Sequence, residues 1–289
     1  MSDAAPDAGV GTSAYVTVNG VRLHYVEAGE GPLVVLLHGF PQFWYAWRHQ
    51  LPALAAAGFR AVAVDLRGYN LSDKPAGVAA YDAGVVAADV AALIAALGEP
   101  DAAVVGHDWG GMIAWRAASA HPERVSRIVA INAPHPRAFA RALRRGRQLL
   151  RSWYVLLFQF PVLPERLLAA RNFAFVTVAL RSHARRDSFS REDVARHKDA
   201  LRRPGALTGA LNYYRAALRR GDPSRARARV TQPALLIWGD RDRYLIPELA
   251  AESAREVPEL RVEHLPEATH WVMADAPARV NELLIDFLR

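Results

Sequence analysis

The stretch VVGHDWGGMIAW, residues 104–115, places a carboxylate where a sharp turn would expose it. An apolar run typical of a strand leads into Asp108, and the residues after it have the composition of a helix. Gly106 and Gly110 stand two residues before and after Asp108, which is the spacing of a strained turn that presents a nucleophile. The alternative is an Asp N-cap that opens the helix, but such a cap would not require both glycines. We therefore take Asp108 as the candidate nucleophile.

Two motifs near the C-terminus supply an acid and a base. LLIWGDRDRYLIP puts Asp240 and Asp242 just past an apolar strand, and LPEATHWV puts His270 in a loop after the last expected strand. A neutral His270 can take a proton from water, while an acid on its other ring nitrogen fixes the tautomer and stabilises the imidazolium. We prefer Asp242 for this acid and assign Asp240 to bracing the turn. The end of the preceding strand, another position for such an acid, carries only Asn132.

The motif HGFP, residues 38–41, follows the first buried strand. The backbone N–H of Phe40, together with that of Trp109, would give two donors for an oxyanion that develops beside Asp108. Taken alone, the motif is also compatible with a plain Gly-Pro turn. Its combination with the turn at Asp108 favours an oxyanion hole.

An aspartate nucleophile favours substitution at a saturated carbon. Attack on a carbonyl would give a mixed anhydride, whereas attack on a strained ring or an alkyl halide gives an ester of Asp108. Water activated by His270 would then hydrolyse that ester. An epoxide leaves as an alkoxide that a phenol of pKa about 10 can protonate, whereas a halide needs only N–H donors. RSWYVLLFQFP and LNYYRAAL offer Tyr154, Tyr213 and Tyr214 for the first case, although packing inside a lid would also explain them.

The elements that must hold these residues alternate along the chain. A hairpin around Asn19-Gly20 is followed by apolar runs such as PLVVLLHGF and RAVAVDL, separated by helical stretches such as VVAADVAALIAALG. This alternation predicts an α/β fold with a mostly parallel sheet covered by helices on both faces. We expect a disordered head at residues 1–13 and a core at 14–136 and 229–289. A helical cap at 137–228 would be inserted between core strands, over the carboxyl edge of the sheet, where open α/β sheets bind ligands.

The composition limits the other classes of function. The 289 residues are 52% hydrophobic with no cysteine, no run could cross a membrane, and the first residues lack a signal peptide's apolar core, so we expect a cytoplasmic enzyme. The formal net charge is +7, with the excess of arginine between Arg137 and Arg229, which leaves an affinity for anionic surfaces open. The aromatic residues there are not interleaved with arginine, so we expect no nucleic-acid binding. The apolar stretch VLLFQFPVLPERLL either lines the lid or forms a homodimer contact.

In combination, these motifs resemble the epoxide hydrolases of the α/β-hydrolase superfamily, from about Tyr15 onward. The stretches that carry the resemblance include LLHGFPQFWYAWRHQ, VGHDWGGMIAW, RSWYVLLFQFP, GALNYYRA and EATHWVMADAPARVNELLIDFL. The resemblance implies the α/β-hydrolase fold and a triad of Asp108, Asp242 and His270. It further implies that the protein converts a small apolar epoxide to a vicinal diol without a cofactor or a metal.

The resemblance also implies two lid tyrosines that grip and protonate the epoxide oxygen, and these map best onto Tyr154 and Tyr214. Tyr214 is preferred to Tyr213 because it takes the second aromatic position of an Asn-aromatic-Tyr-Arg motif. We expect Trp44, Trp153 and Tyr213 to line an apolar path for the substrate, although they could equally pack within the protein.

Two departures separate this chain from related dehalogenases. Haloalkane dehalogenases share the Asp turn and Trp109, but commonly carry Asn where this chain has Phe40. Fluoroacetate dehalogenases typically carry Arg directly after the nucleophile. Both departures favour the epoxide. A dehalogenase and a non-catalytic binding protein on the same fold are the alternatives.

Overall fold

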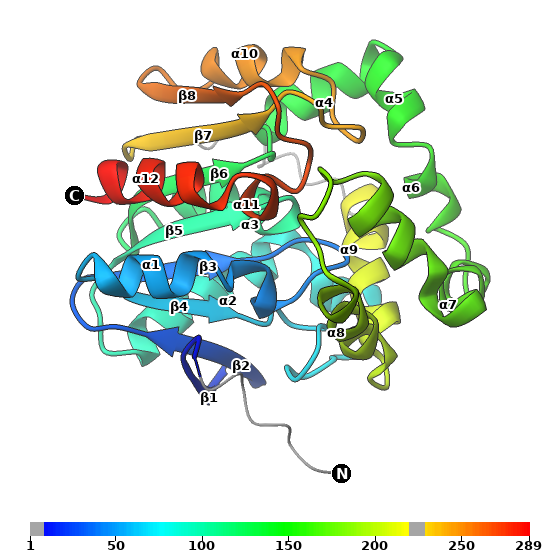
Figure 1. Ribbon diagram of the computed structural model, residues 1–289, viewed down its shortest axis with the longest axis horizontal. Coiled ribbons are helices and arrows are strands. Elements are labelled where there is room, and N and C mark those ends of the chain that lie inside the picture. The colour runs from blue at the N-terminus through cyan, green and yellow to red at the C-terminus, as the bar shows by residue number, and fades with distance from the viewer. Residues whose placement is uncertain (1–8, 220–228) are drawn as a thin grey trace.

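The computed structural model describes residues 9–219 and 229–289. An eight-stranded sheet runs through the molecule in the order β1-β2-β4-β3-β5-β6-β7-β8 (Figure 1). The strands are β1 (Thr12–Val18), β2 (Val21–Ala28), β3 (Leu33–Leu37), β4 (Arg60–Val64), β5 (Ala102–His107), β6 (Val125–Ile131), β7 (Ala234–Gly239) and β8 (Leu260–Leu265). From β4 across to β8 every neighbouring pair is parallel, whereas β1 and β2 are antiparallel. The prediction of a mostly parallel sheet is confirmed.

The hairpin of β1 and β2 forms where the sequence places Asn19-Gly20. Both residues have positive φ, 49° and 75°, as a two-residue hairpin turn requires. β1 begins at Thr12, inside the segment expected to be disordered, because Thr12 and Ser13 pair with β2 in the antiparallel ladder. The strand therefore begins two residues before residue 14, where the core is expected to start. Residues 1–8 of that head lie outside the described residues.

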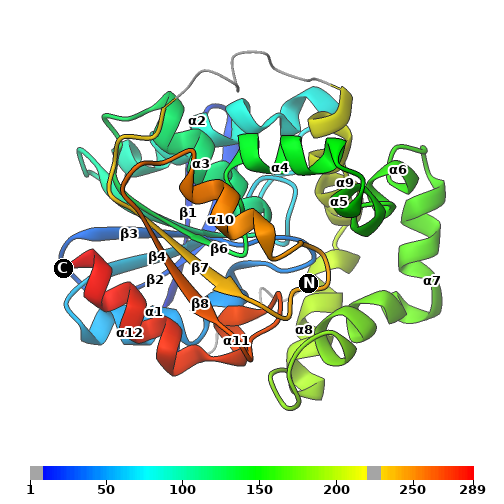
Figure 2. The same ribbon diagram turned by 90° about the horizontal axis from the view of Figure 1, so that it is seen from above.

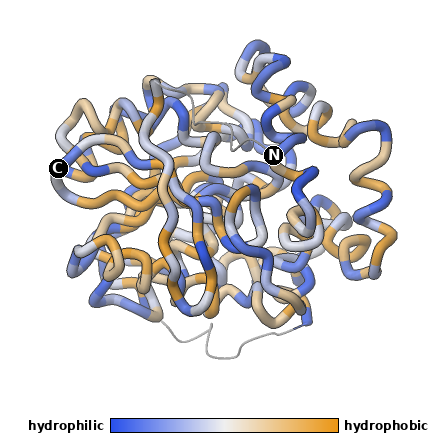
Figure 3. Tube along the Cα trace, turned by 90° about the horizontal axis from the view of Figure 1, so that it is seen from below, coloured by the Kyte–Doolittle hydropathy of each residue, from blue (hydrophilic) through white to orange (hydrophobic). Residues whose placement is uncertain are grey.

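Helices cover both faces of the sheet. One face packs against α2 (Ala83–Ala96), α3 (Trp109–Ala120) and α10 (Glu248–Ala254), and the other against α1 (Gln50–Ala56), α11 (Val272–Asp275) and α12 (Pro277–Leu288). Two short 3-10 helices, η1 (Trp44–Trp47) and η2 (Val78–Tyr81), lie in the connections. The central strands β3, β5 and β7 are buried along their whole length, and hydrophobic (orange) stretches follow the strands in Figure 3. Burial on both faces explains the unbroken apolar runs of these strands.

Between β6 and β7 the chain leaves the sheet and forms a helical layer. Its elements are α4 (Pro136–Arg144), α5 (Arg147–Arg151), α6 (Tyr154–Leu157), α7 (Leu163–Thr177), the π-helical turn η3 (Val178–Ser182), α8 (Arg191–Arg202) and α9 (Ala206–Arg219). α4 packs against α10 of the core, while α6 to α9 lie beyond the carboxyl ends of the strands (Figures 1 and 2). The predicted end of the cap at residue 228 lies outside the described residues. No helix of the described ranges is long and apolar enough to cross a membrane.

Candidate active site

Asp108 occupies a strained turn between β5 and α3. Its φ of 52° and ψ of −119° lie in a region that residues with a side chain rarely adopt, and such strain gathers at functional sites. A Cβ on Gly106 would lie 2.2 Å from the Gly110 carbonyl oxygen, and a Cβ on Gly110 would lie 2.0 Å from the Leu37 carbonyl oxygen. The tight approach of strand and helix therefore requires both glycines. The Asp108 side chain stays 24% exposed.

Two backbone N–H groups converge on the Asp108 carboxylate. That of Phe40 donates to Oδ1 at 3.0 Å, and that of Trp109 donates to the same carboxylate. Gly39 allows this approach, because a Cβ there would lie 2.4 Å from Asp108 Oδ1. Burial alone would raise the pKa of Asp108, but its hydrogen bond to His270 and the charge of that ring outweigh burial and lower the pKa. Asp108 is therefore ionised, with the two predicted oxyanion-hole donors beside it.

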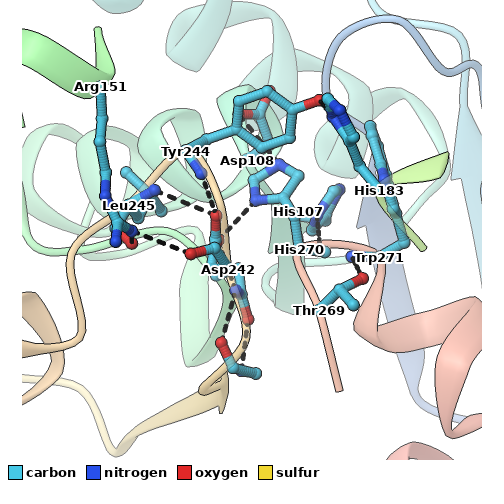
Figure 4. Close-up of polar contacts among 12 residues, drawn as sticks. His107, Asp108, Arg151, His183, Asp242, Tyr244, Leu245, Thr269, His270 and Trp271 are labelled. Atoms are coloured by element: carbon cyan, nitrogen blue, oxygen red, sulfur yellow. Dashed lines mark hydrogen bonds and ion pairs between the residues drawn. The ribbon is translucent and has the colours of Figure 1, made fainter. Parts of the chain in front are cut away.

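His270 is held between two carboxylates (Figure 4). Its Nδ1 lies 2.7 Å from Asp242 Oδ2, and its Nε2 lies 3.6 Å from Asp108 Oδ2. The ring is buried, which by itself lowers the pKa of His270. The charge of Asp242 and the contacts with Asp108 reverse this effect and raise the pKa to about 10. With Asp108 ionised, His270 is thus an imidazolium at neutral pH.

Asp242 is fixed by four hydrogen bonds. Its Oδ1 accepts from the backbone N–H groups of Tyr244 at 2.6 Å and Leu245 at 3.0 Å, and its Oδ2 accepts from Asn132 Nδ2 at 2.6 Å and from the His270 ring. Burial raises the pKa of Asp242, but the charge and hydrogen bond of His270 together with Asn132 lower it overall. Asp240 pairs instead with His264 near the surface. The structure brings Asp242, and not Asp240, to His270.

His107 supports the loop that carries His270. Its Nε2 lies 2.8 Å from the His270 carbonyl oxygen. Burial and the neighbouring charge of His270 lower the pKa of His107 to about 3, so it is neutral and donates through Nε2–H. The strand that leads into Asp108 therefore also positions His270. Among the described residues, no group of three or more His, Cys, Asp or Glu side chains could hold a metal ion.

Tyr154 and Tyr214 face each other from the helical layer. Their ring centroids are 6.0 Å apart, and the Tyr214 ring lies edge-on to Phe40 at 5.7 Å and to Trp109 at 5.0 Å. Burial, and after it the negative charge of Asp108, raise the pKa of both phenols. Both keep their protons at neutral pH and can donate them.

The three residues expected to bind the substrate have other contacts in the structure, and their role in binding stays a prediction. Trp153 is 62% exposed, because it lies on the outer side of the helical layer. The Tyr213 hydroxyl donates to the Arg67 carbonyl oxygen at 2.9 Å, because successive helix residues point about 100° apart and Tyr213 turns into the core when Tyr214 faces Asp108. Trp44 is buried in the core against Phe43. For all three, packing and exposure explain the position without a substrate.

Sequence reasoning missed Tyr244 and His183. The Tyr244 ring lies edge-on to His270 with centroids 5.0 Å apart, and its hydroxyl lies 2.9 Å from His183 Nδ1 (Figure 4). Burial, followed by the charges of Asp242 and Asp108, raises the pKa of Tyr244. The position of Tyr244, two residues after the candidate acid, was an available signal. For His183, which comes from the segment after η3, the sequence held no signal.

Helix α5 holds the acid loop through a second pair of missed residues. Gln148 donates from Nε2 to the Tyr244 carbonyl oxygen at 2.8 Å and accepts at Oε1 from the Ile246 N–H at 3.0 Å. Arg151 donates to the Asp242 carbonyl oxygen at 2.9 Å (Figure 4). Gln148 is fully buried, so these bonds are shielded from water. The loop of the acid is therefore positioned from the helical layer as well as from the sheet.

Comparisons with known proteins agree with this geometry. Residues 32–277 match the alpha/beta hydrolase fold family. AB hydrolase superfamily protein YfhM of Bacillus subtilis (strain 168) is 42% identical over 278 residues, which cover 95% of this chain and 97% of that protein. Epoxide hydrolase 3 of Xenopus tropicalis is 40% identical over 280 residues, which cover 94% of this chain and 76% of that protein. The crystal structure of a Bacillus megaterium epoxide hydrolase in complex with an inhibitor superimposes with a TM-score of 0.85 at 33% identity, covering 95% of this chain and 99% of that one. Fold, site and relatives agree that this chain belongs to the α/β-hydrolase family and, within it, to the epoxide hydrolases.

Proposed function

We propose that this protein hydrolyses a small apolar epoxide to a vicinal diol through a covalent ester on Asp108. The observation that carries the proposal is that the groups needed for both steps surround one ionised, accessible carboxylate. Asp108 lies between the imidazole of His270 and the rings packed around Tyr214, with two backbone donors on its oxygen. Ring opening and ester hydrolysis, the two proposed steps, both use these groups.

In the first step Asp108 attacks a ring carbon of the epoxide. The C–O bond of the strained ring breaks, and the new alkoxide takes a proton from Tyr154 or Tyr214. Both phenols are protonated before the reaction, because burial and Asp108 raise their pKa. The nucleophile is ionised, since the pKa of Asp108 is lowered. The product is a hydroxyalkyl ester of Asp108 and one phenolate.

In the second step water hydrolyses this ester. Esterification removes the negative charge of Asp108 that helps to keep His270 protonated, so the imidazolium first releases its proton to solvent. The neutral His270 then takes a proton from water, the hydroxide attacks the carbonyl carbon of the ester, and the N–H groups of Phe40 and Trp109 stabilise the oxyanion. Collapse expels the diol oxygen, which takes the proton from His270. The carboxylic acid of Asp108 then ionises and its proton returns to the phenolate, while His270 regains a proton from solvent as the negative charge of Asp108 is restored. Asp242 keeps the tautomer of His270 that exposes Nε2, since it binds Nδ1 at 2.7 Å.

The surroundings of Trp109 support an epoxide over a halide. A halide leaving group needs N–H donors and no proton, whereas the ring that packs edge-on against Trp109 at 5.0 Å belongs to Tyr214, a protonated phenol that can donate to an alkoxide. The rings of Phe40, Phe158 and Phe175 pack around the same place, which supports an apolar substrate. We further propose 137–228 as the cap. A cytoplasmic location, a homodimer and the absence of nucleic-acid binding stay predictions.

Single-turnover reaction of styrene oxide in oxygen-18 water tests the proposal. With excess enzyme, we expect diol without label and one oxygen-18 atom in the peptide that contains Asp108, since water attacks the ester carbonyl. Label in the diol on the first turnover would mean that water attacks the ring directly, and would refute Asp108 as the nucleophile. If styrene oxide and a small panel of other epoxides give no diol, while halide is released from haloalkanes, the dehalogenase alternative holds instead.

A further inference from the structure

Exposed apolar side chains are concentrated in one stretch of the helical layer. Of the eleven exposed large hydrophobic side chains in the described ranges, eight lie between residues 149 and 167. These eight, named here the outer cap face, are Leu149, Leu150, Trp153, Leu156, Phe160, Val162, Leu163 and Leu167. Helices α6 and α7, which carry Leu156, Leu163 and Leu167, form the edge of the molecule farthest from the sheet in two perpendicular views (Figures 1 and 2). Exposure of so many apolar side chains in one stretch indicates an interaction surface.

The stretch that carries this face is basic. Between residues 136 and 186 the sequence has a single acidic residue, Glu165. Glu165 is already ion-paired with Arg215, at 2.8 Å. Exposed arginines on the same stretch include Arg144, Arg166, Arg171 and Arg181. The stretch that carries the outer cap face therefore combines exposed apolar side chains with an excess of exposed arginine.

We propose that the outer cap face binds the surface of an anionic lipid bilayer. Such a surface offers hydrocarbon beneath a layer of phosphate, and apolar side chains flanked by arginine match both parts. The indole of Trp153, 62% exposed, suits the headgroup level, where tryptophan is enriched in membrane proteins. The arginines would donate charge-assisted hydrogen bonds to lipid phosphates. The contact is peripheral, with the α/β core outside the bilayer.

The charge pattern disfavours a second copy of this chain as the occupant. A two-fold dimer built on this face would place the same surface on both sides of the interface. The arginines of one copy would then face those of the other. Glu165 cannot compensate for them, because it is engaged by Arg215 within its own chain. An anionic bilayer meets the same arginines with opposite charge.

Cosedimentation of the full chain with lipid vesicles tests this inference. We expect binding to vesicles of phosphatidylcholine with phosphatidylglycerol, little binding to phosphatidylcholine alone, and weaker binding as salt is raised. The double variant Arg166→Gln/Arg171→Gln should bind about fivefold more weakly for each arginine removed. The double variant Leu150→Ser/Phe160→Ser should lose about tenfold or more, because two large apolar contacts disappear. Val85→Ser, which removes an exposed hydrophobic side chain from α2, is the matched control and should bind as the wild type does.

All five side chains are exposed, so circular dichroism and thermal midpoints should match the wild type in every variant. Failure of the wild type to bind anionic vesicles overturns the inference, as does an equal loss in Val85→Ser. Light scattering that shows a dimer which Leu150→Ser/Phe160→Ser dissociates also overturns it, because the face would then be a subunit interface. None of these outcomes depends on the epoxide reaction.

Discussion

Replacement of Asp108 by Asn should lower the pKa of His270 strongly. In the free enzyme this pKa is raised to about 10, because the ring lies between Asp242 and Asp108. An imidazolium cannot act as a base, so the proposed second step requires the pKa of His270 to fall once the first step is complete. Esterification removes the negative charge of Asp108, and an amide in the same position imitates that change.

The size of the change follows from the distance between the two groups. His270 Nε2 and Asp108 Oδ2 are 3.6 Å apart. At an effective dielectric constant of about 20, a pair of unit charges at about 4 Å interacts by about 4 kcal/mol. This corresponds to a factor of about a thousand in proton affinity, since about 1.4 kcal/mol is tenfold. The pKa of His270 should therefore fall from about 10 into the neutral range, and ester hydrolysis should speed up as pH rises through that range.

Histidine ring signals in an NMR titration measure this pKa directly. The His270 signal is assigned by its loss in His270→Gln, and intact mass confirms that the new amide at position 108 is retained. Asp240→Asn is the matched control, because Asp240 pairs with His264 and should leave His270 unchanged. An unchanged His270 pKa in Asp108→Asn, or a wild-type His270 that is already neutral at pH 7, would refute the proposed charge switch.

Three further outcomes follow from the site. His270→Gln should abolish turnover and leave the ester on Asp108 with styrene oxide, visible as added intact mass; an unmodified protein would contradict the two-step scheme. Tyr214→Phe should slow ring opening by about 10²–10⁴-fold in stopped-flow experiments. If it slowed only ester hydrolysis, the acid role would be wrong. Gln148→Ala removes two buried hydrogen bonds from the acid loop, each of about 1 kcal/mol, and should lower kcat more than it changes KM. Gln232→Ala is the control, because Gln232 bonds the Ala118 carbonyl oxygen away from the site. This variant should leave kcat and KM unchanged.

The parts of the site that the sequence predicted are those with short local determinants. The turn at Asp108 needs glycine two residues away on each side, because a Cβ at either position would meet backbone at about 2 Å. Because of this requirement, the spacing of the two glycines around Asp108 can be recognised in the sequence. Asp242 and His270 lie far apart along the chain, but each follows a strand of one parallel sheet, so their side chains meet at its carboxyl edge. The fold class, and the identity of the three side chains that meet at this edge, could therefore be predicted from the sequence.

The helical layer was predicted less well, because composition does not tell which side of a helix faces inward. Trp153 and Tyr154 are neighbours in a single aromatic motif, yet Trp153 is 62% exposed and the pKa of Tyr154 is raised by burial. Tyr213 and Tyr214 differ in the same way. The two sequence motifs identified Tyr154 and Tyr214 as candidate proton donors, but they could not exclude Trp153 or Tyr213 from the substrate path. Only the docking of α6 and α9 on the core decides these orientations.

Contacts across long stretches of chain set the position of the acid, and they carry no local signal. Asp242 is held by Asn132 from the end of β6 and by Arg151 from α5, which come from opposite sides of the point where the helical layer departs from the sheet. Gln148 bonds the backbone on both sides of Leu245 in the same loop. Since Asp242 orients His270, a displacement of α5 would change the orientation of His270 through these hydrogen bonds. The helical layer thus takes part in positioning the proposed acid and base.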